Sequence, residues 1–155
     1  MSSHYEYILT NFPAFNFVGL SIRTSNTTAD VDIAALWDKF FKENWIDKIK
    51  GRMDDDVLGL YFNYEGDFTK PYHFAIGCRV ENLIKVSEDL IALNIPAANY
   101  AEFVAHGKMP DCIIDTWIKI WNSDVVRSYC FDFEVYPQSS FDPKNALVPV
   151  FIGIK

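Results

Sequence analysis

Two short stretches repeat one pattern in the two halves of the chain: Leu36-Trp37-Asp38-Lys39-Phe40-Phe41 and Thr116-Trp117-Ile118-Lys119-Ile120-Trp121. Both read Trp-x-Lys followed by an apolar and an aromatic residue. Both stand in segments whose apolar residues recur at helical spacing, over 31–50 and 111–122. Self-similarity over a long period indicates a repeated structural unit. The sequence therefore predicts two similar halves, each containing one amphipathic helix.

Each predicted helix is preceded by one apolar strand and followed by two. These strands cover 15–23, 57–64 and 72–80 in the first half, and 99–106, 131–136 and 148–154 in the second. The joining segment 81–95 carries a short helical pattern at Leu83, Val86, Leu90 and Leu93. We therefore predict an α+β fold with two strand-helix-strand-strand units, near 12–80 and 97–155 of one domain, related by pseudo-twofold symmetry. In this fold an antiparallel sheet carries two long helices on one face, and a ligand cleft lies between the halves.

The composition limits the classes of function. The 155 residues are 50% hydrophobic and 16% aromatic, and the formal net charge is −7. An acidic surface repels phosphates and attracts cations, so we expect no direct nucleic-acid binding. The first ten residues lack a signal-peptide pattern and no long apolar run predicts a membrane span. The three cysteines have no CxxC spacing, which indicates reduced thiols in a cytoplasmic protein.

Common catalytic motifs are absent from the sequence. The seven glycines form no phosphate-binding loop, and the three histidines have no metal-ligand spacing to one another or to cysteine. No nucleophile elbow and no Cys-His signature appear either. We therefore expect no metal and no cofactor, and the sequence does not require an enzyme.

The strand Phe131-Asp132-Phe133-Glu134-Val135-Tyr136 carries the most informative chemistry. Alternate residues of a strand face opposite ways, so we expect its apolar residues to pack under the helices, with Asp132, Glu134 and Tyr136 on the other side. Plain exposure of those carboxylates to solvent is the alternative. When the two halves are aligned, Glu134 falls opposite Tyr61 and Asp132 opposite Gly59, which favours a concave, aromatic-walled site.

The order of several motifs resembles the GyrI-like family, also called AraC-type effector-binding domains. The matching stretches are 96–103, Gly107, 116–121, 132–136 and 151–155, and the first half fits the same plan. Two departures stand out: Gly153 occupies a position where proline is usual, and 122–128 lacks the usual second tryptophan and Ser-Gly-Tyr turn. The resemblance implies a two-lobed domain with a ligand cleft. Because the chain has no room for a helix-turn-helix beside it, we expect the free-standing form.

The resemblance also implies a set of ligand-binding residues. In the family a glutamate of the strand matching 131–136 lies in the cleft, and members within multidrug-responsive regulators bind lipophilic cations there. Trp121 stands at a position that is often aromatic, and Phe151 matches an aromatic of the last strand. Core packing is the alternative for Trp117 and its counterpart Trp37. The candidate ligand-binding residues are Glu134, Tyr136, Tyr61, Phe151, Trp121, Phe41 and Trp117.

Aromatic faces attract a lipophilic cation, and a carboxylate among them is costly until a cation pairs with it. We therefore expect a small-molecule-binding domain for lipophilic cations. Two alternatives stay open. One is a hydrolase of reactive small molecules that uses Glu134 with Tyr61 or Tyr136. The other is an acidic inhibitor of a DNA-handling enzyme such as gyrase, acting through 54–56, and a DNA-binding regulator is a further possible protein partner.

Overall fold

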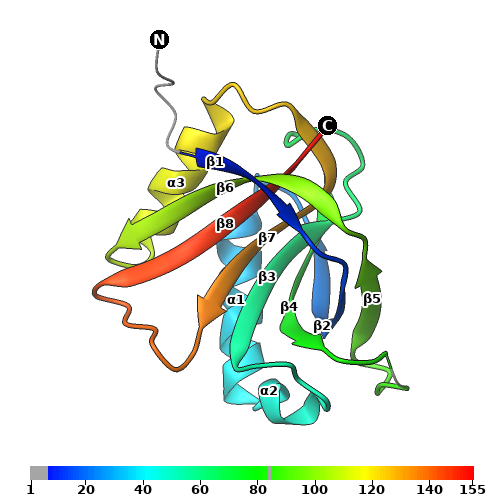
Figure 1. Ribbon diagram of the computed structural model, residues 1–155. Helices are drawn as coiled ribbons and strands as arrows, with labels where there is room; N and C mark the ends of the chain where they lie inside the picture. The colour runs from blue at the N-terminus through cyan, green and yellow to red at the C-terminus, as the bar shows by residue number, and fades with distance from the viewer. Residues whose placement is uncertain (1–6, 84) are drawn as a thin grey trace.

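The computed structural model describes residues 7–83 and 85–155, which form an eight-stranded antiparallel sheet with three helices (Figure 1). The strand order is β1-β6-β8-β7-β3-β4-β2-β5. One of the three histidines, His4, lies outside the described residues, as do most of the first ten residues, in which no signal-peptide pattern was found. The elements are β1 Tyr7–Phe12, β2 Phe15–Thr24, α1 Ala29–Lys42, α2 Trp45–Lys48, β3 Asp56–Phe62, β4 Tyr72–Val80, β5 Ile91–Ile95, β6 Ala98–Gly107, α3 Asp111–Trp121, β7 Arg127–Pro137 and β8 Ala146–Ile154.

The sheet confirms the predicted duplication. The first unit runs β2-α1-β3-β4 and the second runs β6-α3-β7-β8, and in each the first strand pairs with the last and the last with the middle one. The two middle strands, β3 and β7, pair with each other at the centre of the sheet. Exchange of the two units therefore reproduces the strand order, as pseudo-twofold symmetry requires.

The strands that precede the two units are exchanged between them. β1 comes before the first unit but pairs with β6 of the second, from Tyr7 opposite Phe103 to Phe12 opposite Ala98. β5 comes before the second unit but pairs with β2 of the first, from Phe15 opposite Ile95 to Gly19 opposite Ile91. Each unit thus completes the sheet edge of the other. This exchange was not predicted, because a strand of five or six residues carries little periodic signal.

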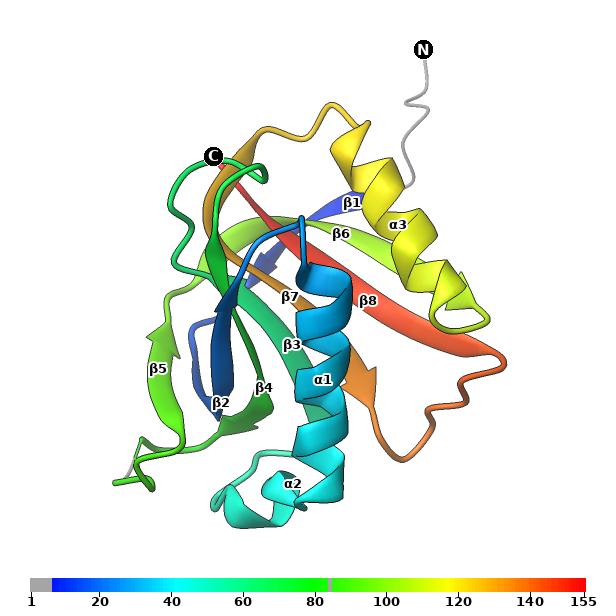
Figure 2. The same cartoon turned by 180° about the vertical axis from the view of Figure 1, so that it is seen from behind.

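Both long helices cover one face of the sheet (Figure 2). α1 packs through Leu36 and Phe40 on a cluster that includes Tyr61, and α3 packs through Ile120 on residues of β6 and β8. The opposite face is also apolar, since it carries a second hydrophobic cluster around Phe133. All members of this cluster come from strands. Two buried faces explain why so many strand residues are hydrophobic.

The assignment of faces in the central strand was wrong. We predicted that Phe131, Phe133 and Val135 pack under the helices, but these side chains join the all-strand cluster on the far face. The helices instead lie on the side of Tyr61 and Tyr136, since Trp117 of α3 contacts Tyr61 and Trp37 of α1 contacts Tyr136. The acidic face of β7 is therefore the helix-covered face.

Two predicted helical segments also end differently. The helix expected over 31–50 ends at Lys42, because Asn44 adopts a left-handed conformation with φ of 56° before the short α2 begins at Trp45. The described residues of the segment 81–95, where a helical pattern was expected, instead form bends and turns followed by β5 at Ile91–Ile95. Short apolar runs fit either structure, and pairing with β2 decides in favour of a strand.

The three cysteines are free thiols. Of the helices that the described residues form, none has the length and apolar character needed to cross a membrane.

Candidate ligand-binding site

A cavity of about 450 Å³ lies between the two long helices, over the centre of the sheet. Residues of α1 and α3 form its walls, and residues of β3 and β7 form its floor. Its surface is dominated by aromatic rings, with a few polar groups among them, which is the usual make-up of a small-molecule site. The aromatic lining residues are Trp37, Tyr61, Tyr64, Phe68, Tyr72, Trp117, Trp121 and Tyr136.

Glu134 lies at the floor of the cavity and is 2% exposed. Its Oε2 accepts hydrogen bonds from the Tyr61 hydroxyl at 2.9 Å and from Trp117 Nε1 at 2.7 Å. Its Oε1 accepts one from the Tyr136 hydroxyl at 2.6 Å. All three donors are uncharged, so the carboxylate is well oriented but its charge is not balanced by any of them.

Burial is the dominant influence on the protonation of Glu134. Desolvation raises the pKa of its carboxyl above the ordinary value of 4.5, and the three hydrogen bonds oppose this rise without cancelling it. The same burial, together with the nearby carboxylate, raises the pKa values of Tyr61 and Tyr136 well above 10.0. Both tyrosines therefore stay neutral donors across the physiological pH range.

The pseudo-twofold axis passes between Glu134 and Gly59. The Trp37 ring contacts Tyr136 at 4.9 Å between centroids, and the Trp117 ring contacts Tyr61 at 5.1 Å, so the two pairs are equivalent. Gly59 precedes Tyr61 by two residues, as Glu134 precedes Tyr136. Gly59 and Glu134 are direct partners across β3 and β7. The alignment that set Glu134 opposite Tyr61 and Asp132 opposite Gly59 was therefore wrong, since Glu134 pairs with Gly59.

Gly59 leaves the space that the glutamate occupies. A Cβ atom at this position would lie 3.2 Å from Glu134 Oε1 and 3.2 Å from the ring of Phe74. Such contacts are tighter than most observed ones, so a side chain here would push on the carboxylate. The floor of the cavity thus has one carboxylate beside the axis, facing a glycine that makes room for it.

A second buried charge lies beside the first. Asp132 is 0% exposed, and its Oδ2 accepts hydrogen bonds from Arg127 Nη2 at 2.6 Å and from the Tyr64 hydroxyl. Its Oδ1 accepts a hydrogen bond from the backbone N–H of Gly153 at 2.8 Å. Burial opposes the charge of Arg127, but Asp132 and Tyr64 outweigh it and raise the pKa of the guanidinium. Asp132 and Arg127 therefore form an ion pair.

This ion pair explains one departure from the GyrI-like pattern and coincides with the other. A proline at position 153 has no N–H and could not donate to Asp132 as Gly153 does. Arg127 belongs to the segment 122–128 that lacks the usual tryptophan and turn. Sequence reasoning missed Arg127 as a cavity residue, because it lies before the recognised part of β7 and one arginine carries no motif. The unusual segment itself was the available signal.

The structure brings most of the candidate residues together. Five of them line the cavity: Glu134, Tyr136, Tyr61, Trp117 and Trp121. Trp117 is therefore a cavity residue and does not serve only to pack the core. Trp37, for which core packing was the alternative, lines it as well.

Phe41 and Phe151 lie elsewhere than predicted. Phe41 is 46% exposed and stacks on the outer side of Trp37, with 5.9 Å between ring centroids. Phe151 stacks on Phe133 at 4.8 Å and belongs to the all-strand cluster on the far face. Neither residue is among the described lining residues of the cavity. Phe151 pairs with Phe133 across β7 and β8, and paired residues share a face, which fixes its direction.

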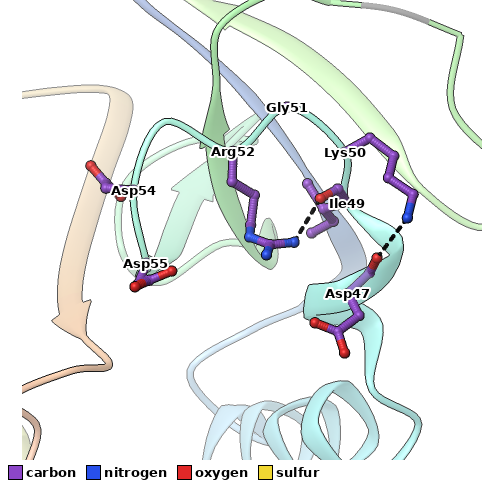
Figure 3. Close-up of a pocket in the computed structure, with 7 residues that line it drawn as sticks. All are labelled: Asp47, Ile49, Lys50, Gly51, Arg52, Asp54 and Asp55. Atoms are coloured by element: carbon purple, nitrogen blue, oxygen red, sulfur yellow. Dashed lines mark hydrogen bonds between the residues drawn. The ribbon is translucent and has the colours of Figure 1, made fainter.

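Figure 3 shows a different hollow, at the connection between α2 and β3. Its lining is polar, and Arg52 Nη1 donates to the backbone oxygen of Ile49 at 2.9 Å, while Lys50 Nζ donates to that of Asp47 at 3.3 Å. It shares no described lining residue with the Glu134 cavity. Its basic groups are already engaged with backbone, so it offers no comparable site.

The duplicated strand-helix-strand-strand sheet, with two long helices on one face, is that of a GyrI-like effector-binding domain. The chain belongs to the Cass2 family of integron-associated effector binding proteins, whose family model matches residues 9–154. It is therefore an effector-binding protein.

Two relatives of about 30% identity and one more distant solved structure are similar to the chain. Protein YobU of Bacillus subtilis (strain 168), named provisionally as a transcriptional regulator, is 31% identical in an alignment of 154 residues that covers 95% of this chain and 96% of YobU. The Vibrio cholerae integron cassette protein VCH_CASS2 is 30% identical with a TM-score of 0.77, over 97% of this chain and 96% of that chain. SAV2435, solved bound to tetraphenylphosphonium, is 20% identical with a TM-score of 0.76, over 97% and 94% respectively, and shares the fold.

Proposed function

We propose that the protein binds hydrophobic organic cations in the aromatic cavity, with Glu134 as the opposing charge. The observation that carries this proposal is a carboxylate that is 2% exposed and hydrogen-bonded by uncharged donors. Among the ion pairs of the described residues, none involves Glu134. A buried carboxylate without a cationic partner is costly, and a bound cation removes that cost.

The surrounding rings suit a cation that is large and apolar. Aromatic faces attract positive charge through their quadrupole, by about 0.5–2 kcal/mol per ring depending on desolvation. They also supply a large apolar contact area, which does not depend on a particular ligand shape. Glu134 would then select for charge, while the rings around it tolerate many molecular outlines.

Two further observations support the proposal. The formal net charge of −7 raises the local concentration of cations near the protein. SAV2435, which has the same fold, was solved with tetraphenylphosphonium, a bulky apolar cation. The provisional naming of YobU as a regulator is compatible with such a ligand acting as a signal.

The test compares tetraphenylphosphonium with tetraphenylborate, which has nearly the same shape and the opposite charge. We expect calorimetric titration to show binding of the phosphonium, together with a rise in melting temperature, and no binding of the borate. Phe41→Ala is the matched control, since Phe41 stacks outside the cavity and its loss should leave both results unchanged. Equal binding of the two ions would refute charge selection, and no binding of either would refute the proposal.

A further inference from the structure

Arg127 is the second buried ionic group that lines the cavity. Its side chain is 7% exposed, and the guanidinium carbon lies 5.7 Å from the Trp117 ring centroid and 5.7 Å from that of Tyr64. Its hydrogen bonds to described residues both leave from Nη2, to Asp132 at 2.6 Å and to the Tyr64 hydroxyl oxygen at 3.3 Å. Arg127 is thus held in place from one end of its guanidinium.

The Nε–H group of Arg127 is buried and has no acceptor within the described part of the chain. Buried polar groups are nearly always hydrogen-bonded, and one left unpaired destabilises the protein. Arg79 Nε shares this property, but Arg79 binds Asp54 and Asp56 near the surface and is not a lining residue of the cavity. The side chain of Arg127 therefore combines two features, an N–H group without an acceptor among the described residues and a place in the wall of the cavity.

Asp132 already neutralises the charge of Arg127. This limits the kind of ligand atom that can accept a hydrogen bond from Nε. Asp132 lies 2.6 Å from Nη2, so a second anion would meet the attraction of Arg127 and the repulsion of Asp132 together. An uncharged oxygen gains the hydrogen bond without that repulsion. Carbonyl, ester and ether oxygens are of this type.

Trp117 sets the distance between the two polar positions. Its indole N–H donates to Glu134 at 2.7 Å, while the Arg127 guanidinium carbon lies 5.7 Å from the centroid of the same side chain. One indole therefore separates the place of the cation from the place of the acceptor. A ligand that uses both must carry its oxygen about one aromatic ring away from its positive centre.

From these contacts we propose that Arg127 is a ligand-binding residue, and that the effector class is a hydrophobic cation with an uncharged hydrogen-bond acceptor. This inference rests on the proposed function, because it takes the cation at Glu134 as given. The ligand then has two recognised groups, the cation and the acceptor. The acceptor is bound by Arg127, which lies in the segment 122–128 that departs from the GyrI-like pattern.

The test uses three triphenylphosphonium ions that differ in one chain: n-heptyl, 3-(ethoxycarbonyl)propyl and 3-carboxypropyl. The heptyl and ester chains have similar length, so the ratio of their dissociation constants reports the acceptor. We expect this ratio to favour the ester in the wild-type protein and to fall about tenfold when Arg127 is replaced, as one hydrogen bond to a charged group predicts.

The variants must not leave a buried charge unpaired. Arg127→Met combined with Asp132→Asn removes the ion pair as a unit, and Arg127→Lys keeps the pair but lacks Nε, so it serves if the double variant does not fold. Arg79→Met is the matched control, because it removes the other unpaired Nε outside the cavity. Its ratio should equal that of the wild-type protein.

Each outcome decides between the two proposals. An unchanged ester-to-heptyl ratio in the Arg127 variants, with all three proteins binding both ions, overturns the inference and leaves the proposed function standing. Tightest binding of the carboxylate ion overturns the uncharged acceptor. Failure of the wild-type protein to bind any of the ions overturns both proposals.

Discussion

Replacement of Glu134 by glutamine removes the charge at the floor of the cavity and keeps its shape. The amide oxygen takes the place of Oε2 and accepts from Tyr61 and from Trp117, whose N–H can only donate. The amide nitrogen then faces the Tyr136 hydroxyl, which changes from donor to acceptor. All three hydrogen bonds survive, so the change isolates the charge.

The expected loss of affinity follows from the charge separation. Phenyl rings keep a phosphonium centre roughly 6 Å from the carboxylate, and two unit charges at that distance attract by about 3 kcal/mol at an effective dielectric constant of about 20. Part of this energy is spent in ionising Glu134, whose pKa burial has raised. We therefore expect Glu134→Gln to weaken cation binding by about 1.5–3 kcal/mol, or roughly 10- to 150-fold.

The empty protein should respond in the opposite direction. Because burial disfavours the ionised carboxyl, Glu134→Gln should melt at the same temperature as the wild type or slightly above it. Both proteins would be titrated with tetraphenylphosphonium and with neutral triphenylphosphine oxide, which should bind the two alike. Unchanged phosphonium affinity in a variant that melts normally would mean that the cation binds away from Glu134, and the reasoning from its burial would fail.

Three further predictions concern the same floor. Cation affinity should be low near pH 4.5 and increase as the pH rises through the raised pKa of Glu134. The protonated carboxyl stabilises the empty protein, and this stabilisation should be lost over the same pH interval. Ligand titrations and thermal melts at several pH values would show both effects. Gly59→Ala should cost about 1–3 kcal/mol in denaturant unfolding, since its Cβ would lie 3.2 Å from the carboxylate. Asp132→Asn should lower the free energy of unfolding by about 3–5 kcal/mol, because Arg127 stays buried and unpaired. Asp54→Asn, which breaks an ion pair near the surface, should lower it by less than about 1 kcal/mol. Similar melting temperatures for the two variants would contradict this difference.

The duplicated plan of the fold could be predicted from the sequence. The repeated Trp-x-Lys pattern identified Trp37 and Trp117 as equivalent, and strand alternation put Glu134 and Tyr136 on one face. These signals are local in the chain, so they survive without knowledge of the tertiary structure. They account for Glu134 and the residues that hydrogen-bond to it, including Tyr61 on the equivalent strand, but not for most of the other lining residues.

The sequence could not predict which face of the sheet each side chain lies on, because both faces are buried. Alternation separates two faces but does not say which one the helices cover, and Phe133 is as apolar as a helix-covered residue would be. Phe151 was misplaced for the same reason, since its direction depends on pairing with Phe133. Arg127 required knowledge of where the irregular segment before β7 leads. The one-domain reading with repeats near 12–80 and 97–155 stays a prediction.

The exchanged edge strands bear on how a fold of this kind could be assembled from a shorter chain. A polypeptide that held a single copy of the repeat, with its preceding strand, would lack the partner that its own first strand requires, since β1 pairs with β6 and β5 with β2. Two such polypeptides would satisfy each other by reciprocal donation of that strand, as in a domain-swapped dimer. In this chain, which holds both copies, the same donation is intramolecular. Separating the lobes therefore means breaking two strand pairings as well as opening the centre of the sheet.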